Sequence, residues 1–246
     1  MSQTALSDAA IAARALACLD LTDLSERPTD EGTDELCRKA VAGGVAAICL
    51  WPQFVSRART HLAGTEVAIA TVVNFPLGED DIERVVDDTQ EALSDGATEI
   101  DLVLPYRSLL AGKPDPARCM IAAIRPVVDG GRRLKVILET GSLDPGTIAA
   151  ASRLAIEGGA DFIKTSTGKS AVSATPEAAT IMLEAIKASG RPVGLKVSGG
   201  VRTLADARLY LELADALMGP DWAGPATFRI GASGLYDALV AARATA

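Results

Sequence analysis

Short hydrophobic runs alternate along the chain with longer amphipathic stretches. Eight of the short runs have the length and residue types of strands, while the stretches between them have helical spacing. In order, the runs are ALACLDL (15–21), VAAICLW (45–51), VAIATVV (67–73), TEIDLVLP (98–105), RLKVILET (133–140), DFIKTS (161–166), VGLKVS (193–198) and TFRIGAS (227–233). Regular alternation of strand and helix predicts parallel strands that are joined by right-handed crossovers.

Residues at the ends of the amphipathic stretches predict where helices begin and end. One helix is expected to start at Thr33 and to close at Gly43. Another has Thr175 as its N-cap and Gly190 beyond its C-terminus, and a third starts at Thr203 with an acidic residue three positions later. Hydroxyl side chains at the first position and glycine after the last turn are typical of helix termini.

Eight strand and helix repeats in a chain of 246 residues fit the size of a closed barrel. The predicted fold is therefore an α/β fold, a (β/α)8 TIM barrel, with an extra N-terminal helix at about residues 5–15. An open doubly wound sheet stays the alternative at this point, because periodicity does not show closure. Without a linker or a shift in composition, we expect residues 1–246 to form a single domain.

Composition and charge narrow the possible functions. The net charge of −8 and the pI near 4.8 argue against nucleic acid or an anionic membrane as the main partner. The N-terminus lacks the pattern of a signal peptide, and the four cysteines lack a CxxC spacing, so we expect a cytoplasmic protein with reduced thiols. His61 is the only histidine, in a charged stretch typical of a surface, and we expect neither a metal site nor a cofactor.

Ionisable residues inside the predicted strands are the strongest chemical signal. They are Asp20, Asp101, Lys135, Lys164 and Lys196. Burial of a charge is costly unless the charge is paired or neutralised, so several in one barrel require a reason. One reading is an ion-pair network that only stabilises the barrel, and this reading stays open for each residue taken alone.

A second reading makes Lys164 a covalent catalyst. Lys164 and Lys196 occupy similar positions on neighbouring strands, about 4.8 Å apart, so their ammonium groups can interact. A neighbouring positive charge and desolvation both lower the pKa of a lysine, and a neutral amine attacks carbonyls to form a Schiff base. Asp101 can pair with Lys196 and move protons through a water molecule. These residues favour Schiff-base chemistry.

Glycine-rich loops after the last three strands predict an anion site. TSTGKS follows Lys164, SGGVRT follows Lys196, and GASGL ends the eighth strand. Loop N–H groups at this end of a barrel commonly bind phosphate. A nucleotide P-loop is excluded, because Ile163 occupies the position where its first glycine is required. The expected phosphate ligands are Gly168, Lys169, Gly199, Gly200, Arg202, Gly231, Ser233 and Gly234.

Several longer motifs, namely EIDLVLPYR, LKVILETG, ADFIKTSTGK, LKVSGGVRT and RIGASGL, closely resemble those of the deoxyribose-phosphate aldolase family. The match continues in order over nearly the whole chain. The resemblance implies a (β/α) barrel that cleaves 2-deoxy-D-ribose 5-phosphate reversibly into D-glyceraldehyde 3-phosphate and acetaldehyde, a lyase step of deoxyribose phosphate catabolism. It also implies that Lys164 forms the Schiff base and that Lys196 and Asp101 donate and accept protons.

The resemblance further implies a substrate pocket lined by Asp20, Thr22, Cys49, Lys135 and Thr165. Taken alone, Cys49 in a hydrophobic run is typical of a buried core thiol. The chain departs from some relatives in having Val197 in place of proline and Gly234 in place of a second serine, both near the phosphate end.

Two alternatives remain open on the sequence. One is a different Schiff-base aldolase, and the other is a phosphate-binding barrel without covalent chemistry, such as a sugar-phosphate isomerase or binder. The expected partners are sugar phosphates and aldehydes, together with a possible homodimer.

Overall fold

All eight predicted strands are present in the computed structural model, which describes residues 6–244, and they close into a parallel barrel. Each strand pairs with the next in chain order, and the eighth pairs with the first. Closure confirms the barrel and excludes the open sheet. The strands are β1 (Leu19–Asp23), β2 (Ala47–Leu50), β3 (Ala68–Val73), β4 (Glu99–Val103), β5 (Arg133–Ile137), β6 (Phe162–Lys164), β7 (Gly194–Ser198) and β8 (Phe228–Ala232).

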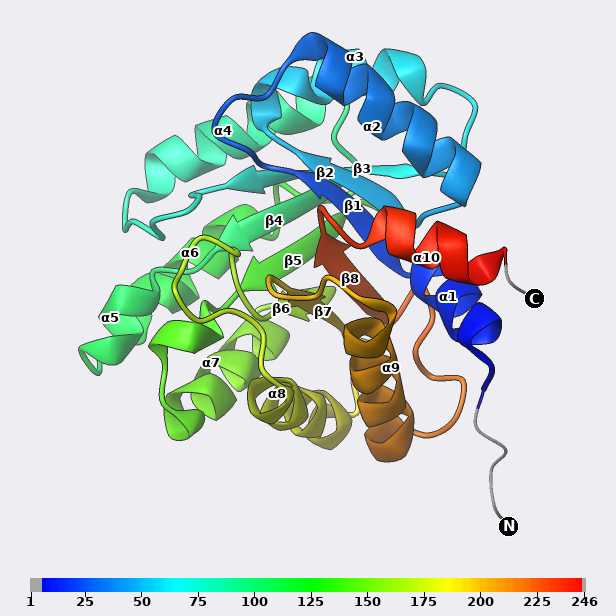
Figure 1. Cartoon of the computed structure of the whole chain (residues 1–246). Coiled ribbons are helices and arrows are strands. Elements are labelled where there is room, and N and C mark those ends of the chain that lie inside the picture. Colours follow the sequence, from blue (N-terminus) through cyan, green and yellow to red (C-terminus); the bar gives the residue numbers. More distant parts are fainter. Residues whose placement is uncertain (1–5, 245–246) are drawn as a thin grey trace.

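Helices surround the barrel, and the N-terminal and C-terminal helices pack against each other on one side of it (Figure 1). Short 3-10 turns occur at Pro52–Phe54 and Thr140–Ser142. The helices are α1 (Asp8–Ala17), α2 (Asp30–Gly43), α3 (Val55–His61), α4 (Ile82–Asp95), α5 (Tyr106–Leu110), α6 (Asp115–Ile124), α7 (Pro145–Glu157), α8 (Pro176–Ser189), α9 (Leu204–Met218) and α10 (Tyr236–Arg243).

The extra N-terminal helix is confirmed as α1, although it begins at Asp8 and continues to Ala17, two residues beyond the expected end. The first expected residue, at position 5, lies outside the described residues. The helix therefore takes up part of the run that was predicted as the first strand, and β1 begins only at Leu19.

One predicted helix start is wrong. The helix α2 begins at Asp30 rather than at Thr33, and the N-cap is Thr29, whose hydroxyl accepts a hydrogen bond from Gly32 N–H at 3.0 Å. Thr33 lies inside the first turn and donates its hydroxyl to the Thr29 carbonyl. Thr29 and Thr33 are each followed by two acidic residues, which are favourable in the first turn of a helix, so the local signal suits both positions and does not choose between them.

The other two helix starts are confirmed. Thr175 caps α8, which ends at Gly190 with a φ of 63°, a conformation that favours glycine. Thr203 and Asp206 form a complete capping box at the start of α9. Local signals of this kind are read correctly because both partners lie within a few residues.

Strand register sets the depth of the polar side chains inside the barrel. Asp101 lies level with Lys135 in the pairing of β4 with β5, and Lys164 lies level with Lys196 in the pairing of β6 with β7. The aliphatic side chains of the strands form the layer between barrel and helices, where Ile100 is fully buried. The barrel interior thus contains charged residues where branched aliphatic residues are usual.

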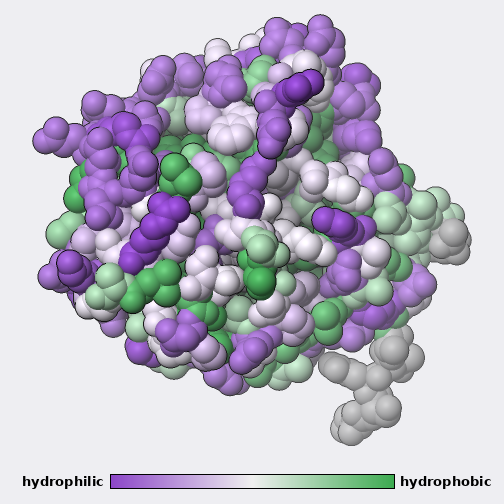
Figure 2. All heavy atoms as spheres, turned by 60° about the vertical axis from the view of Figure 1, so that its left-hand side comes forward, coloured by the Kyte–Doolittle hydropathy of each residue, from purple (hydrophilic) through white to green (hydrophobic). Residues whose placement is uncertain are grey.

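Hydrophilic side chains dominate the rim of the face shown in Figure 2, and hydrophobic residues are scattered there. Within residues 6–244, no helix combines the length and the hydrophobicity needed to cross a membrane.

Candidate active site

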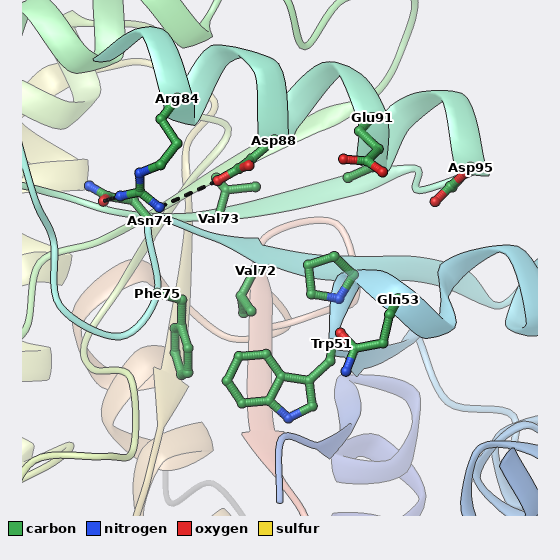
Figure 3. A pocket seen from close by; sticks show the side chains of 12 residues that line it. Trp51, Gln53, Val72, Val73, Asn74, Phe75, Arg84, Asp88, Glu91 and Asp95 are labelled. Atoms are coloured by element: carbon green, nitrogen blue, oxygen red, sulfur yellow. Dashed lines mark hydrogen bonds and ion pairs between the residues drawn. The ribbon is translucent and has the colours of Figure 1, made fainter. Parts of the chain in front are cut away.

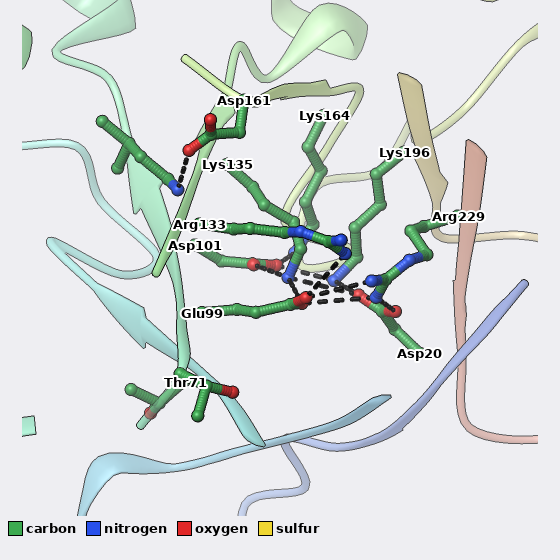
Figure 4. A network of polar contacts seen from close by, with 12 residues as sticks. Asp20, Thr71, Glu99, Asp101, Arg133, Lys135, Asp161, Lys164, Lys196 and Arg229 are labelled. Atoms are coloured by element: carbon green, nitrogen blue, oxygen red, sulfur yellow. Dashed lines mark hydrogen bonds and ion pairs between the residues drawn. The ribbon is translucent and has the colours of Figure 1, made fainter. Parts of the chain in front are cut away.

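Seven charged side chains converge inside the barrel (Figure 4). Their residues are at most 2% exposed, and they come from six of the eight strands. The cluster comprises Asp20, Glu99, Asp101, Lys135, Lys164, Lys196 and Arg229.

Asp101 lies at the centre of the upper part of this cluster, which is the part nearer the C-terminal ends of the strands. Its Oδ2 accepts hydrogen bonds from Lys164 Nζ and Lys196 Nζ, each at 2.7 Å. Its Oδ1 accepts one from Lys135 Nζ at 2.9 Å. A single carboxylate therefore links the two lysines that the sequence placed side by side, and it holds Lys164 Nζ in a defined position.

The lower part of the cluster continues the charge pairing toward the N-terminal ends of the strands. Glu99 pairs with Lys135 at 2.5 Å and with Arg229 at 3.0 Å. Asp20 pairs with Lys196 and with Arg229, both at 2.6 Å. Lys135 thus contacts three carboxylates, since it also pairs with Asp20 at 3.4 Å, and Lys196 contacts two, whereas Lys164 contacts only Asp101.

The charges of the seven buried residues balance only if Lys164 is a neutral amine, whereas Arg133, which also pairs with Glu99 at 3.3 Å, is 38% exposed to solvent. Apart from Lys164 the cluster contains three acids and three cations, namely Asp20, Glu99 and Asp101 with Lys135, Lys196 and Arg229. A protonated Lys164 would add one uncompensated positive charge in a buried site, which is costly.

The pKa values of the two facing lysines move in opposite directions. Burial, with the positive charge of Lys196, lowers the pKa of Lys164, and these effects outweigh the attraction of Asp101. Burial also acts to lower the pKa of Lys196, but Asp101 and Asp20 outweigh it and raise that pKa. Lys164 is therefore suited to be a nucleophile and Lys196 to remain an ammonium.

Glu99 and Arg229 are members of the cluster that the sequence reasoning missed. Both lie inside predicted strands, in TEIDLVLP and TFRIGAS, so the signal that identified Asp101 and Lys135 applied to them equally. Burial of a charged side chain is costly unless that charge is paired. Glu99 and Arg229 each contact at least two opposite charges.

A cavity of about 520 Å³ lies between the loops that follow β1, β6, β7 and β8. It brings together every residue expected to bind phosphate, along with Thr22 and Ser198. The expected residues that line it are Gly168, Lys169, Gly199, Gly200, Arg202, Gly231, Ser233 and Gly234.

Glycine is required at two positions of this cavity. Gly199 has a φ of 81°, and a Cβ there would approach the Ser173 side chain to 2.5 Å. A Cβ at Gly231 would meet Ser198 Oγ at 2.8 Å and Lys196 Cε at 3.0 Å. Gly231, which lines the cavity, therefore lies directly beside the Lys196 side chain.

The other expected pocket residues are placed less uniformly. Thr22 lines the cavity and donates its hydroxyl to the Asp20 carbonyl at 2.8 Å. Thr165 is buried, and its hydroxyl accepts a hydrogen bond from Ser198 N–H at 3.0 Å. Cys49 is fully buried against Leu24, and burial raises the pKa of its thiol. Cys49 is therefore a core thiol beside the charged cluster.

A match to a family model shows to which protein family the chain belongs. Residues 12–234 match the model described as DeoC/LacD family aldolase, and this range includes the whole lysine cluster. The chain belongs to the DeoC/LacD aldolase family. It is an aldolase, a lyase that breaks or forms carbon–carbon bonds.

Individual relatives agree with the family match. Over 230 residues this aldolase is 53% identical to the deoxyribose-phosphate aldolase of Agrobacterium fabrum, covering 92% of this chain and 89% of the relative. Among solved structures it is similar to the tetrameric deoxyribose phosphate aldolase of Aeropyrum pernix, with a TM-score of 0.79 and 28% identity over 98% of this chain and 94% of that one. The apo structure of a protein described as a deoxyribose-phosphate aldolase from Toxoplasma gondii ME49 is also similar. Its TM-score is 0.88 and its identity 25%, over 97% of this chain and 98% of that one.

A second pocket of the aldolase, of about 350 Å³, lies outside the charged cluster (Figure 3). Trp51 packs edge-on against Phe75 at its base, with ring centroids 5.5 Å apart, and donates its indole N–H to the Ser25 carbonyl. Arg84 and Asp88 on α4 pair at 3.6 Å at its rim. Trp51 packs against Phe75 there, and this pocket has no lysine among its lining residues.

His61 ends α3 and pairs with Asp34 at 2.9 Å, with 40% of its side chain exposed. This position agrees with the predicted surface role. Among the described residues, no group of three or more His, Cys, Asp and Glu side chains is arranged to hold a metal ion.

Proposed function

We propose that this aldolase cleaves 2-deoxy-D-ribose 5-phosphate reversibly into D-glyceraldehyde 3-phosphate and acetaldehyde, through a Schiff base on Lys164, in the catabolism of deoxyribose phosphate. The observation that carries the proposal is the hydrogen-bonded unit of Lys164, Asp101 and Lys196 beside a glycine-lined cavity. The 53% identical Agrobacterium fabrum enzyme, named for this activity, supports the choice of substrate.

In the proposed mechanism the Lys164 amine attacks the C1 aldehyde of the open-chain sugar. The resulting carbinolamine loses water and forms a protonated imine. The C3 hydroxyl then gives up its proton, the C2–C3 bond breaks, and its electron pair moves to C2 to form an enamine. D-Glyceraldehyde 3-phosphate leaves at this stage.

Protonation of the enamine at C2 regenerates the imine, and water releases acetaldehyde and the free lysine. Asp101 accepts one hydrogen bond from Lys164 Nζ and another from Lys196 Nζ. Asp101 and Lys196 can therefore accept and return these protons. The imine nitrogen serves as the electron sink, so this route needs no metal or organic cofactor.

The 5-phosphate is proposed to bind at the cavity between the β6, β7 and β8 loops. Gly199 and Gly200, and likewise Ser233 and Gly234, lie in the loops that precede α9 and α10 and line this cavity, where successive backbone N–H groups can bind an anion. Lys169 and Arg202 add positive charge from loops that line the same cavity.

Gly234→Ser is expected to lower the KM for deoxyribose 5-phosphate a few-fold. Gly234 does not have a positive φ, and a Cβ there would meet nothing within 4 Å, so serine fits and adds one hydroxyl donor. One such hydrogen bond is worth about 1 kcal/mol. Steady-state kinetics should show the KM for unphosphorylated deoxyribose nearly unchanged, with Gly234→Ala as the matched control. Equal changes for both sugars would place the anion elsewhere.

Borohydride trapping with acetaldehyde tests the proposed chemistry directly. Reduction of the imine should leave an ethyl group in place of one hydrogen on the lysine nitrogen, and peptide mapping should assign it to Lys164. An enzyme that turns over deoxyribose 5-phosphate without any adduct on Lys164 would show that the covalent mechanism is wrong.

We further propose that residues 1–246 work as one domain in the cytoplasm and that the chain forms a homodimer. The four free cysteines, Cys18, Cys37, Cys49 and Cys119, suit a reducing compartment. Light scattering on the purified chain should give twice the mass of one chain, and a tetramer, as in the Aeropyrum pernix relative, would contradict the proposal.

A further inference from the structure

Glu139 is a buried acid outside the lysine cluster, on the loop that follows β5. It is 1% exposed, and its backbone is left-handed, with φ 58° and ψ 56°. This conformation is uncommon for residues other than glycine, asparagine and aspartate, and it persists only where the surroundings hold the residue in place. Its surroundings are the loop that connects Lys164 to the phosphate cavity.

The Glu139 carboxylate holds this loop through Thr167. Its Oε2 accepts the Thr167 hydroxyl at 2.5 Å and the Thr167 backbone N–H at 3.4 Å. Thr167 Oγ1 in turn accepts the backbone N–H of Lys169 at 3.1 Å. A hydroxyl bound to a buried carboxylate forms a strong, charge-assisted hydrogen bond.

Backbone contacts connect the same two loops and extend to a third. Thr140 N–H donates to the Thr165 carbonyl at 2.9 Å. Lys169 Nζ donates to the Leu24 carbonyl at 2.7 Å, across the cavity on the loop after β1. The conformation of residues 165–169 thus depends on Glu139 at one end and determines where the Lys169 ammonium lies at the other.

Three side-chain atoms on this pair of loops are buried without a hydrogen-bond partner among residues 6–244. They are Glu139 Oε1, Thr140 Oγ1 and Ser166 Oγ. Unpaired buried polar atoms and a left-handed glutamate both reduce stability, and natural proteins keep such features mainly at functional sites.

We propose that Glu139 is a positioning residue that acts through Thr167 to orient the 165–169 loop for the phosphate group of the substrate. This inference rests on the proposed function. Glu139 contacts neither Lys164 nor Asp101 through any hydrogen bond in the structure, so its effect should fall on phosphate recognition and leave imine formation unchanged.

The test compares Glu139→Gln and Glu139→Gly on phosphorylated and unphosphorylated deoxyribose. Both variants should raise the KM for deoxyribose 5-phosphate about tenfold, the factor expected when a charged hydrogen-bond partner is lost. Activity on unphosphorylated deoxyribose and borohydride trapping at Lys164 should stay near those of the unmodified enzyme. Glycine adopts the left-handed backbone without strain, so Glu139→Gly removes the carboxylate without adding backbone strain.

Variants of Thr167 complete the test. Thr167→Val should raise the KM for deoxyribose 5-phosphate as the Glu139 variants do. Thr167→Ser keeps the hydroxyl and should have the KM of the unmodified enzyme. The double variant Glu139→Gln with Thr167→Val should have the same KM as Thr167→Val alone. An unmodified KM in Glu139→Gly, or equal losses on both sugars, would overturn the inference. Either result in an enzyme that still forms the Lys164 adduct would leave the proposed function intact, whereas absence of the adduct in the unmodified enzyme would reject that function itself.

Discussion

Lys164→Ala is expected to lower turnover of deoxyribose 5-phosphate by at least about 10³-fold, because no other side chain can then form the imine. The variant should remain folded. Asp101 keeps hydrogen bonds from Lys135 and Lys196 when Lys164 is removed, so no buried carboxylate is left unpaired. Steady-state kinetics together with thermal unfolding would separate loss of chemistry from loss of structure.

Lys187→Ala is the matched control for this result. Lys187 is exposed on α8, outside the barrel, and its ammonium contacts only the Leu217 carbonyl among the interactions of its side chain described in the structure. It should keep normal turnover. Activity of Lys164→Ala within tenfold of the unmodified enzyme would show that Lys164 is not the nucleophile.

Lys196→Leu is expected to shift the acid limb of Schiff-base formation to higher pH and to lower kcat. The positive charge of Lys196 helps to keep the pKa of Lys164 below its usual value, and Asp101 opposes it. Without Lys196, Asp101 holds the Lys164 ammonium more strongly, so the pKa of Lys164 rises and less neutral amine is present at a given pH. Loss of a positioned proton donor lowers the rate by a further factor of about 10²–10⁴.

The measurement is the rate of borohydride trapping with acetaldehyde as a function of pH, alongside kcat at the optimum. Asp20 retains Arg229 and Asp101 retains Lys135 in this variant, so the barrel should still fold. An acid limb at the same pH as in the unmodified enzyme would show that Lys196 does not control the ionisation of Lys164.

The sequence by itself determined the order of elements and the depth of the key side chains. A period of two or 3.6 residues is a local property, so all eight strands and the capping of α8 and α9 could be predicted. Because parallel neighbours pair in register, Lys164 and Lys196 in similar strands had to lie close together once adjacent. The start of α2 was missed because two threonines four residues apart both suit an N-cap.

Only the tertiary structure decided that the barrel closes and how its charges pair. Pairing of β8 with β1 depends on the accumulated twist and tilt of all the strands, which no single segment encodes. Closure brings Asp101 within 2.7 Å of the ammonium groups of Lys164 and Lys196. Lys196 also contacts a second carboxylate, that of Asp20, so its pKa is raised, whereas the pKa of Lys164 is lowered. The Glu139 contact with Thr167 likewise joins loops that are 28 residues apart. Electrostatic energies depend on distance and burial in space, and for that reason the chemistry of these residues follows from the folded barrel.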